Sequence, residues 1–378
     1  MISLDGGTQT RLRLAEVPGL EFYYFIVWYG ACLRRSCREH HLSHSNRELR
    51  LMVQNQLNAR SLLLLGGSGF VGQSINSFLA EELDGSLKFQ VVYFASRNPT
   101  TTTQPWARSL RVDLTSDQLS IPEVDVILHA ATPASAELNT YSPTEMYSLN
   151  VSVMSRLLDT LRSWSKPPLV IFTSSGAVYG EMPQDATSFI EGQGRLAMKQ
   201  TNISAYAEGK RAAEAMLQEA TGSGLCKGIT TRLFAFSGKH LPRDRHFAIG
   251  NFVQSSVTMK KVVVRSDGSS VRSYLDERDM AHWLLSICQN GTSDQIYHIG
   301  SERAISIREL AFLVAERCEL MTGEKIPVEI LGKSSPLDGV SRYVPSTIQT
   351  REKLGLSETI SLESSIDSML QAAISQHS

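Results

Sequence analysis

The chain has 378 residues, which is enough for about two domains with a sizeable core. Hydrophobic residues make up 42% and charged residues 20%, and 37 Lys and Arg residues nearly balance 38 Asp and Glu residues. This composition is typical of a globular protein and excludes a disordered or fibrous chain. The net charge of -1 gives no reason to expect a nucleic-acid partner.

Residues 1–58 differ in character from the rest, and we expect an N-terminal extension that is disordered or belongs to a misassigned start. The apolar run at 22–33 is shorter than the roughly 20 residues of a membrane-spanning helix. Basic residues follow this run, whereas they precede it in a secretory signal. We therefore expect no membrane partner. The five cysteines are odd in number and scattered, which favours the reduced thiols of a cytoplasmic protein. The spacing of Cys32, Cys37 and His40 fits no zinc pattern, so we expect no metal.

From residue 61 onward, short apolar runs alternate with longer amphipathic stretches. This pattern predicts an α/β fold, with a doubly wound parallel sheet covered by helices on both faces. The expected strands are 61–65, 89–95, 124–129, 169–173 and 228–233, and the expected helices are 72–83, 143–163 and 205–220. After residue 235 the sequence pattern changes to loops rich in Gly, Pro and Arg. We expect a Rossmann domain at 59–235 and a smaller C-terminal α/β domain at 236–378, some elements of which return to the first domain. The second domain is expected to hold an apolar stretch at 261–265 and helices near 279–289 and 306–317.

The first expected strand runs into a glycine-rich turn and then a helix, reading LLLLGGSGFVG from residue 62. Gly66 permits a tight turn, Gly69 lets the backbone approach a pyrophosphate, and Gly72 allows close packing of the helix. The N–H groups at the start of the helix, around Phe70 and Val71, favour phosphates. The order of strand, glycine turn and helix predicts a dinucleotide-binding site.

Further segments agree, in chain order, with one known family. They are Asp113-Leu114, at the position that follows the third strand of that family, 125–131 (DVILHAA), Asn150, 173–180 (TSSGAVYG), the YxxxK pair of Tyr206 and Lys210, 272–279 (RSYLDERD) and 297–301 (YHIGS). With the glycine turn, they make the chain from about residue 61 onward resemble the extended short-chain dehydrogenase/reductase family of nucleotide-sugar epimerases, dehydratases and reductases. The resemblance implies an NAD(P) cofactor, a nucleotide-diphosphate sugar as substrate and a homodimer formed through two long helices per subunit. It places the substrate mainly on the C-terminal domain, and further cofactor contacts at Asp113, Leu114, Ala130 and Ala131.

Three residues are expected to carry the chemistry. Tyr206 and Lys210 are four residues apart, so both side chains lie on one face of a helix. A phenol has a pKa near ~10, and a neighbouring ammonium favours its anion, so Lys210 makes Tyr206 a usable acid/base. The resemblance adds Ser175, which would hydrogen-bond the same substrate oxygen. The alternative is that Tyr206 and Lys210 have no catalytic role and form an ordinary exposed pair on an amphipathic helix.

The end of the second strand bears on the choice of cofactor. An acidic residue there usually holds the ribose of NAD, but this chain has Ser96 and Arg97. Both groups suit the 2'-phosphate of NADP, although Arg97 can also be a solvated loop charge. We expect NADP or NAD, with NADP favoured.

Two small residues restrict the range of reactions that we expect. In the family, dehydratases carry an Asp-Glu pair after the catalytic Thr, and decarboxylases carry a Glu at the second position. Here these positions are Gly176 and Ala177, which cannot transfer a proton. We therefore expect hydride transfer at a sugar carbon, C4, by an epimerase or a ketoreductase, with a 4,6-dehydratase or decarboxylase as the alternative. A different class of function is also possible for this fold, a non-catalytic NADP-binding scaffold or sensor. The presence of all three catalytic residues disfavours it.

Substrate contacts are expected at three positions. Ser175 is one of them. Arg272 resembles the family arginine that grips the diphosphate, with a salt bridge to Asp279 as the alternative. Tyr179 either lines the sugar pocket or packs. Ala235 stands where the family has a substrate-contacting Asn, which leaves the identity of the sugar open.

Overall fold

The computed structural model describes residues 60–81, 89–99, 102–131, 140–192, 204–243, 247–333 and 340–377. The expected extension at 1–58, with its cysteine and histidine cluster, lies outside the described residues. Within the described ranges, no helix is long and apolar enough to cross a membrane. Over the same residues, no group of three or more His, Cys, Asp or Glu side chains lies close enough together to hold a metal ion.

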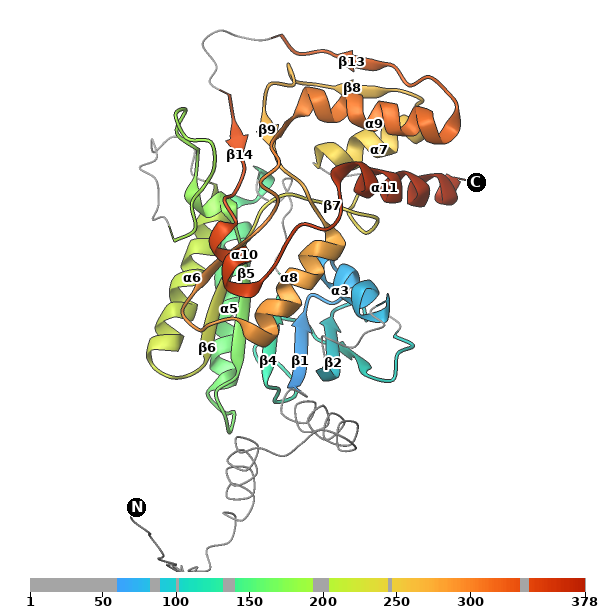
Figure 1. The fold of residues 1–378 in the computed structure, drawn as a ribbon. Helices are drawn as coiled ribbons and strands as arrows, with labels where there is room; N and C mark the ends of the chain where they lie inside the picture. Colours follow the sequence, from blue (N-terminus) through green and yellow to red (C-terminus); the bar gives the residue numbers. More distant parts are fainter. Residues whose placement is uncertain are drawn as a thin grey trace, which may run out of the picture. The chain divides into compact units, whose positions relative to one another are not determined.

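Seven parallel strands form the central sheet, in the order β11-β6-β5-β4-β1-β2-β3 (Figure 1). Because the chain starts in the middle of the sheet and winds out to both sides, the carboxyl ends of β1 and β4 meet at the point where the strand order reverses. The strands are β1 (Arg60–Leu65), β2 (Phe89–Ser96), β3 (Ala107–Arg111), β4 (Val126–His129), β5 (Leu169–Ser175), β6 (Lys227–Leu233) and β11 (Ile296–Ile299).

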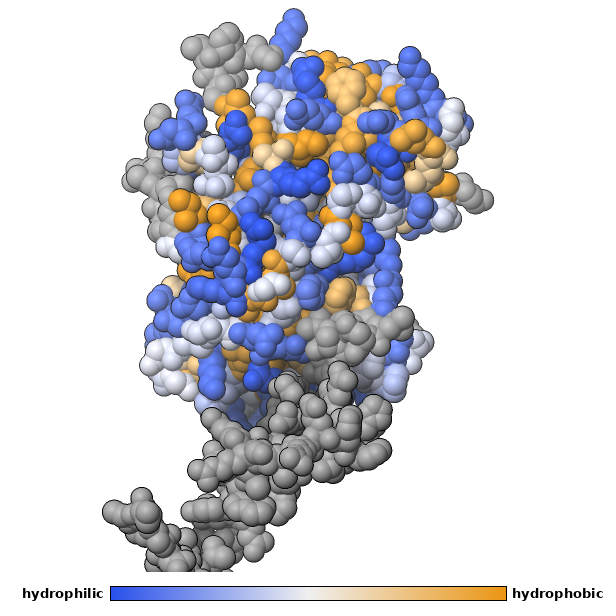
Figure 2. All heavy atoms as spheres, in the orientation of Figure 1, coloured by the Kyte–Doolittle hydropathy of each residue, from blue (hydrophilic) through white to orange (hydrophobic). Residues whose placement is uncertain are grey.

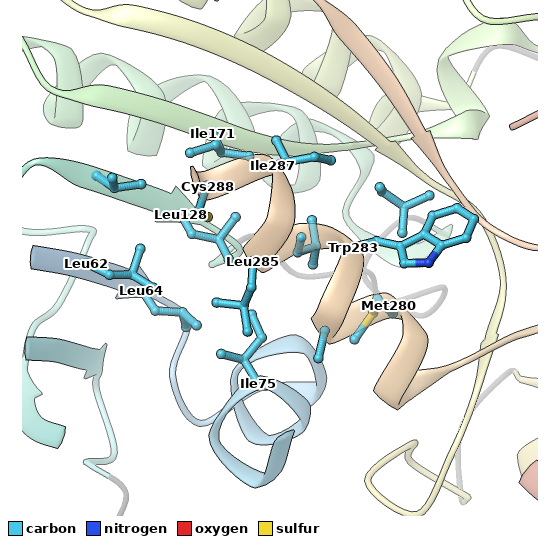
Figure 3. Packing of buried hydrophobic residues seen from close by; sticks show 14 of the residues in the cluster. Leu62, Leu64, Ile75, Leu128, Ile171, Met280, Trp283, Leu285, Ile287 and Cys288 are labelled. Carbon is cyan, nitrogen blue, oxygen red and sulfur yellow. The ribbon is translucent and has the colours of Figure 1, made fainter. Parts of the chain in front are cut away.

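The central strands are apolar on both sides because helices cover both faces of the sheet. In β1, Leu62 and Leu64 face one layer and Leu63 and Leu65 face the other, and all four are fully buried. The first layer holds α3 (Phe70–Glu81) and α8 (Glu277–Asn290), and the second holds α5 (Pro143–Leu161) and α6 (Ala205–Gly222). Figure 3 shows the first layer, where Leu285 and Cys288 of α8 lie on the side of the helix that faces the leucines, and Trp283 lies farther along the same apolar cluster.

A third apolar core belongs almost entirely to the chain after residue 240. It is formed by α7 (Ala248–Thr258), α9 (Ile307–Thr322) and α11 (Leu362–His377), together with the paired strands β8 (Val262–Val264) and β13 (Val328–Ile330). Short elements join this core to the sheet: β7 (Phe236–Ser237), β10 (Leu275–Asp276), β9 (Val271–Arg272), β12 (Ile305–Ser306), β14 (Arg342–Tyr343) and α10 (Ile348–Leu354). Figure 2 shows apolar side chains gathered over this upper region, whereas polar side chains cover most of the rest of that face.

The predicted fold class is confirmed, and each expected strand and helix of the first domain is present. The expected strand 124–129 begins two residues later, at Val126, and the helix expected at 72–83 begins at Phe70. The pattern did not predict α7, because its apolar face is short, or the two- and three-residue strands of the C-terminal part.

Candidate active site

The glycine-rich turn lies against the end of β4. Gly66 has φ +98, in the left-handed region that favours glycine, and a Cβ there would lie 2.7 Å from the carbonyl oxygen of Ala130. A Cβ at Gly72 would lie 2.5 Å from the carbonyl oxygen of Gly67, so the first turn of α3 can pack only with glycine at this position. A side chain at either position would fill the close approach between turn, helix and β4. The residues present thus fit a dinucleotide phosphate at the start of α3.

The other expected cofactor residues stand at the same end of the sheet. Ser96 ends β2, and its hydroxyl donates to the carbonyl oxygen of Asn98 at 2.6 Å. Asp113 is exposed and accepts hydrogen bonds from the amide and hydroxyl of Thr115, which lower the pKa of its carboxyl. The positive charge of Arg97, which is exposed directly after β2, makes a smaller contribution to lowering the same pKa. Four further expected residues, Phe70, Val71, Leu114 and Ala131, are partly buried.

Ser175, Tyr206 and Lys210 are brought together at the carboxyl end of β5. Ser175 is the last residue of β5, and its hydroxyl accepts a hydrogen bond from the amide of Ala177 at 3.2 Å. Tyr206 lies in the first turn of α6 and shares a hydrogen bond with Ser175. The Lys210 Nζ, one turn further along α6, donates to the carbonyl oxygen of Thr173 at 2.7 Å.

Burial dominates the electrostatics of this cluster. It raises the pKa of Tyr206, and the hydrogen bond with Ser175 opposes this rise only in part. It also lowers the pKa of Lys210 to about 7. The Lys210 Nζ lies 5.7 Å from the centroid of the Tyr206 ring and donates to the Thr173 carbonyl oxygen. Because burial pushes Lys210 toward the neutral amine, the support of the Tyr206 phenolate that the sequence predicts requires a group that keeps Lys210 charged.

Tyr343 is a residue of this cluster that the sequence did not predict. It belongs to β14, and its hydroxyl lies 3.3 Å from the Ser175 Oγ and donates to the carbonyl oxygen of Leu233 at 3.4 Å. Burial strongly raises the pKa of the Tyr343 phenol, so this hydroxyl keeps its proton. Tyr343 is 168 residues from Ser175 in sequence, and no local pattern connects the two.

Gly176 is covered by an aromatic ring. A Cβ at this position would lie 2.5 Å from Cε1 and 2.7 Å from Cζ of Phe234. The ring of Phe234 packs in turn on Tyr343, at 4.9 Å between centroids, and on His298, at 5.1 Å. The position therefore has no space for any side chain.

The expected substrate residues Tyr179 and Arg272 differ in their surroundings. Tyr179 is 1% exposed, stacks on Phe189 and shares a 2.6 Å hydrogen bond with His298 Nε2, which are the contacts of a packed residue. Arg272 is half-buried on β9 and donates to the carbonyl oxygens of Val271 and Ser341.

The alternative of a salt bridge between Arg272 and Asp279 is wrong. The Asp279 carboxylate accepts hydrogen bonds from the amide and hydroxyl of Thr359 and from the amide of Ile360. Its role is to hold the turn that precedes α11, and the Arg272 side chain points its donors at the 341 backbone instead.

Comparison with known proteins places the chain in a family. The model of the NAD dependent epimerase/dehydratase family matches residues 62–300, and the chain belongs to this family. It is an NAD(P)-dependent enzyme of the extended short-chain dehydrogenase/reductase type, as the sequence predicted.

Individual relatives are distant. UDP-glucuronic acid decarboxylase 6 of Arabidopsis thaliana is 25% identical over 317 residues, which are 82% of this chain and 87% of the relative. Two solved structures share the fold with a TM-score of 0.69, 19% identity and coverage of 84% of this chain and 100% of theirs. They are UDP-glucose 4-epimerase from Thermotoga maritima with UDP-glucose and RMD from Pseudomonas aeruginosa with NADPH.

Proposed function

We propose that the protein exchanges a hydride with one carbon of a nucleotide-diphosphate sugar, at C4, as an epimerase or a ketoreductase. The observation that carries the proposal is the Phe234 ring over Gly176. A dehydratase needs a second acid/base group beside the catalytic hydroxyl, and here an aromatic ring fills that space. Ala177 offers no titrating group either, so Tyr206 remains as the acid/base and the reaction is confined to one hydroxyl-bearing carbon.

Each of the three catalytic residues has a distinct role in this proposal. Tyr206 accepts the proton of the sugar hydroxyl during oxidation and returns a proton to the same oxygen during reduction. Ser175 donates a hydrogen bond to that oxygen and places it for proton transfer. Lys210 as a cation favours the Tyr206 phenolate. A bound nicotinamide would supply the acceptor and donor of the hydride.

The remaining expected residues bind the two ligands. The turn from Gly66 to Gly72 and the start of α3 would hold the cofactor phosphates, Asp113 the adenine side, and Ala130 and Ala131 one wall of the site. NADP is favoured by the exposed guanidinium of Arg97 at the end of β2. Residues 236–378 would mainly bind the substrate.

Decarboxylation is the second candidate function, and the UDP-glucuronic acid decarboxylases among the relatives favour it. The residues at 176 and 177 oppose it, because neither can carry a proton.

One experiment separates these reactions. The purified protein is first treated with acid, and any released nucleotide is identified by mass spectrometry. It is then incubated with UDP-glucose or UDP-glucuronic acid and NAD, and separately with a 4-keto nucleotide sugar and NADPH. An isomer of unchanged mass with NAD retained on the protein supports an epimerase, and a product with two added hydrogens supports a ketoreductase. Loss of carbon dioxide or of water would refute the proposed reaction.

The variant Tyr206→Phe tests whether the protein is an enzyme or a scaffold. We expect it to bind NADPH or NAD as the wild type does and to lose turnover. Unchanged biological activity with cofactor still bound would favour the scaffold.

We further propose a cytoplasmic homodimer. The free, buried thiols of Cys226, Cys288 and Cys318 support a reducing compartment. The exposed Tyr147 on α5, 42% accessible, supports an interface through α5 and α6. Light scattering on the purified protein measures the mass of the assembly, and the variant Tyr147→Lys should shift a dimer toward the monomer.

A further inference from the structure

Lys210 is held in surroundings that disfavour its charge. Its side chain is 2% exposed, its Nζ lies 4.8 Å from the centroid of the Phe172 ring, and it donates to the Thr173 carbonyl oxygen. Burial accordingly lowers the pKa of this ammonium to about 7. An amine that is neutral in part of the molecules would assist the phenolate of Tyr206 only in the remainder.

Glu214 supplies the opposing charge. It lies one turn after Lys210 on α6, with its side chain 14% exposed, and its negative charge raises the pKa of Lys210 against the effect of burial. Both carboxylate oxygens of Glu214 are fixed. Arg232 on β6 donates from Nε to Oε1 at 3.1 Å and from Nη2 to Oε2 at 2.8 Å, and the hydroxyl of Ser174 donates to Oε1.

Among the groups that the structure describes, Glu214 is the one whose negative charge raises the pKa of Lys210. His129, at the end of β4, is fully buried and neutral, because burial and the charge of Lys210 together lower its pKa to about 3. Tyr206 on the same helix keeps its proton in the resting state, since burial raises its pKa. From α5 the buried Asn150 faces Gly209, and its amide cannot titrate. Arg232 is positively charged and is held in its ion pair with Glu214.

We propose that Glu214 is a positioning residue that keeps Lys210 a cation, and that Arg232 limits how much of the Glu214 charge Lys210 receives. This inference rests on the proposed function, in which Lys210 assists Tyr206. Arg232 and Lys210 share one carboxylate, so loss of the carboxylate and loss of the arginine act on Lys210 in opposite directions. A carboxylate that served only to hold α6 against β6 would give no such difference of sign.

The test is a direct titration of Lys210 in the whole protein without substrate. Protein labelled with [ε-13C]lysine is followed by NMR from acid to alkaline pH, and the Lys210 signal is assigned by its loss in Lys210→Met. In Glu214→Gln we expect the titration midpoint of Lys210 to fall by about one pH unit or more, the usual size of an opposite-charge effect at close range. In Arg232→Gln we expect the midpoint to rise.

A matched control is available on the same helix. Glu208 pairs with Arg211, and its charge is not among the causes that shift the pKa of Lys210. In Glu208→Gln the midpoint should therefore stay at the wild-type value. If Arg232→Gln fails to fold, Arg232→Lys replaces it and should leave the midpoint at or above that of the wild type.

Two results would overturn the proposal. One is a midpoint in Glu214→Gln equal to that in Glu208→Gln. The other is a fall of the same size in Glu214→Gln and in the arginine variant, because that would trace the shift to the lost ion pair and not to the carboxylate charge. The titration needs no turnover, so a failure of the proposed enzymatic reaction would show separately, in the sugar assays, and leave this result standing.

Discussion

The contact between Gly176 and Phe234 predicts a specific intolerance of the site. In Gly176→Ala the new methyl group would lie 2.5 to 2.8 Å from three ring carbons of Phe234. Carbon atoms in good contact are ~3.5–4.0 Å apart, so the overlap is roughly 1 Å. The ring cannot easily move, because it is 7% exposed and packs against Phe189, Tyr343 and His298.

Overpacking of this kind costs about 1–3 kcal/mol. We expect Gly176→Ala to lower the melting temperature by several degrees, as followed by differential scanning calorimetry. Gly222→Ala is the matched control, since a Cβ there meets nothing within 4 Å and alanine suits the end of a helix. Phe234→Leu should relieve the overlap, so the double variant should be more stable than the sum of the two single changes by about 1 kcal/mol or more.

A Gly176→Ala protein that melts with the wild type would refute this reasoning. The position would then have room for a side chain, and the argument against a second acid/base group would fail with it. An additive double variant would also count against the contact with the ring.

Three further predictions concern the hydroxyl of Tyr343, the charge of Arg97 and the dependence of stability on pH. Tyr343→Phe removes a hydroxyl bonded to Ser175, and a hydrogen bond of about 1 kcal/mol corresponds to a several-fold lower kcat/KM; unchanged kinetics would exclude the contact from catalysis. Arg97→Ala should weaken NADPH binding by about tenfold and leave NADH binding nearly unchanged, as measured by fluorescence titration, and an equal loss for both would contradict the 2'-phosphate assignment. Burial lowers the pKa of His129 and His298 to about 3, below the roughly 6.5 of an unfolded chain, so the unfolded state binds more protons between these values. Stability should be complete above about pH 6.5 and fall as the pH drops toward 3, and urea midpoints should decline less steeply for His298→Gln than for the wild type.

The parts of the fold that the sequence predicted are those with strong local periodicity. The four leucines of β1 and the amphipathic α5 and α6 carry their burial in their own spacing, so their boundaries agree with the structure to within a few residues. The third strand, Ala107–Arg111, is mostly exposed at the edge of the sheet and has no apolar run to mark it. The strands of two or three residues exist only because a distant partner pairs with them, as Val262 pairs with Val328.

The residues of the candidate site fall into the same two groups, those that a local sequence pattern predicts and those that it does not. The glycine turn and the pair of Tyr206 and Lys210 could be predicted because each depends on spacing within one element. Glu214 follows Lys210 by four residues on the same helix face, and that spacing was a usable signal. Tyr343 and Phe234 reach the site across large sequence separations, and only the assembled fold brings them there.

The order of strands in the sheet also has a consequence for synthesis of the chain. The last strand of the sheet, β11, pairs with β6 and is supplied by residues 296–299, after the whole of segment 234–295. On the ribosome, the outer edge of β6 therefore stays open until most of the polypeptide has emerged. An unpaired parallel strand is a template for association between chains. We therefore expect nascent or truncated chains that end before residue 296 to associate more readily than the complete chain.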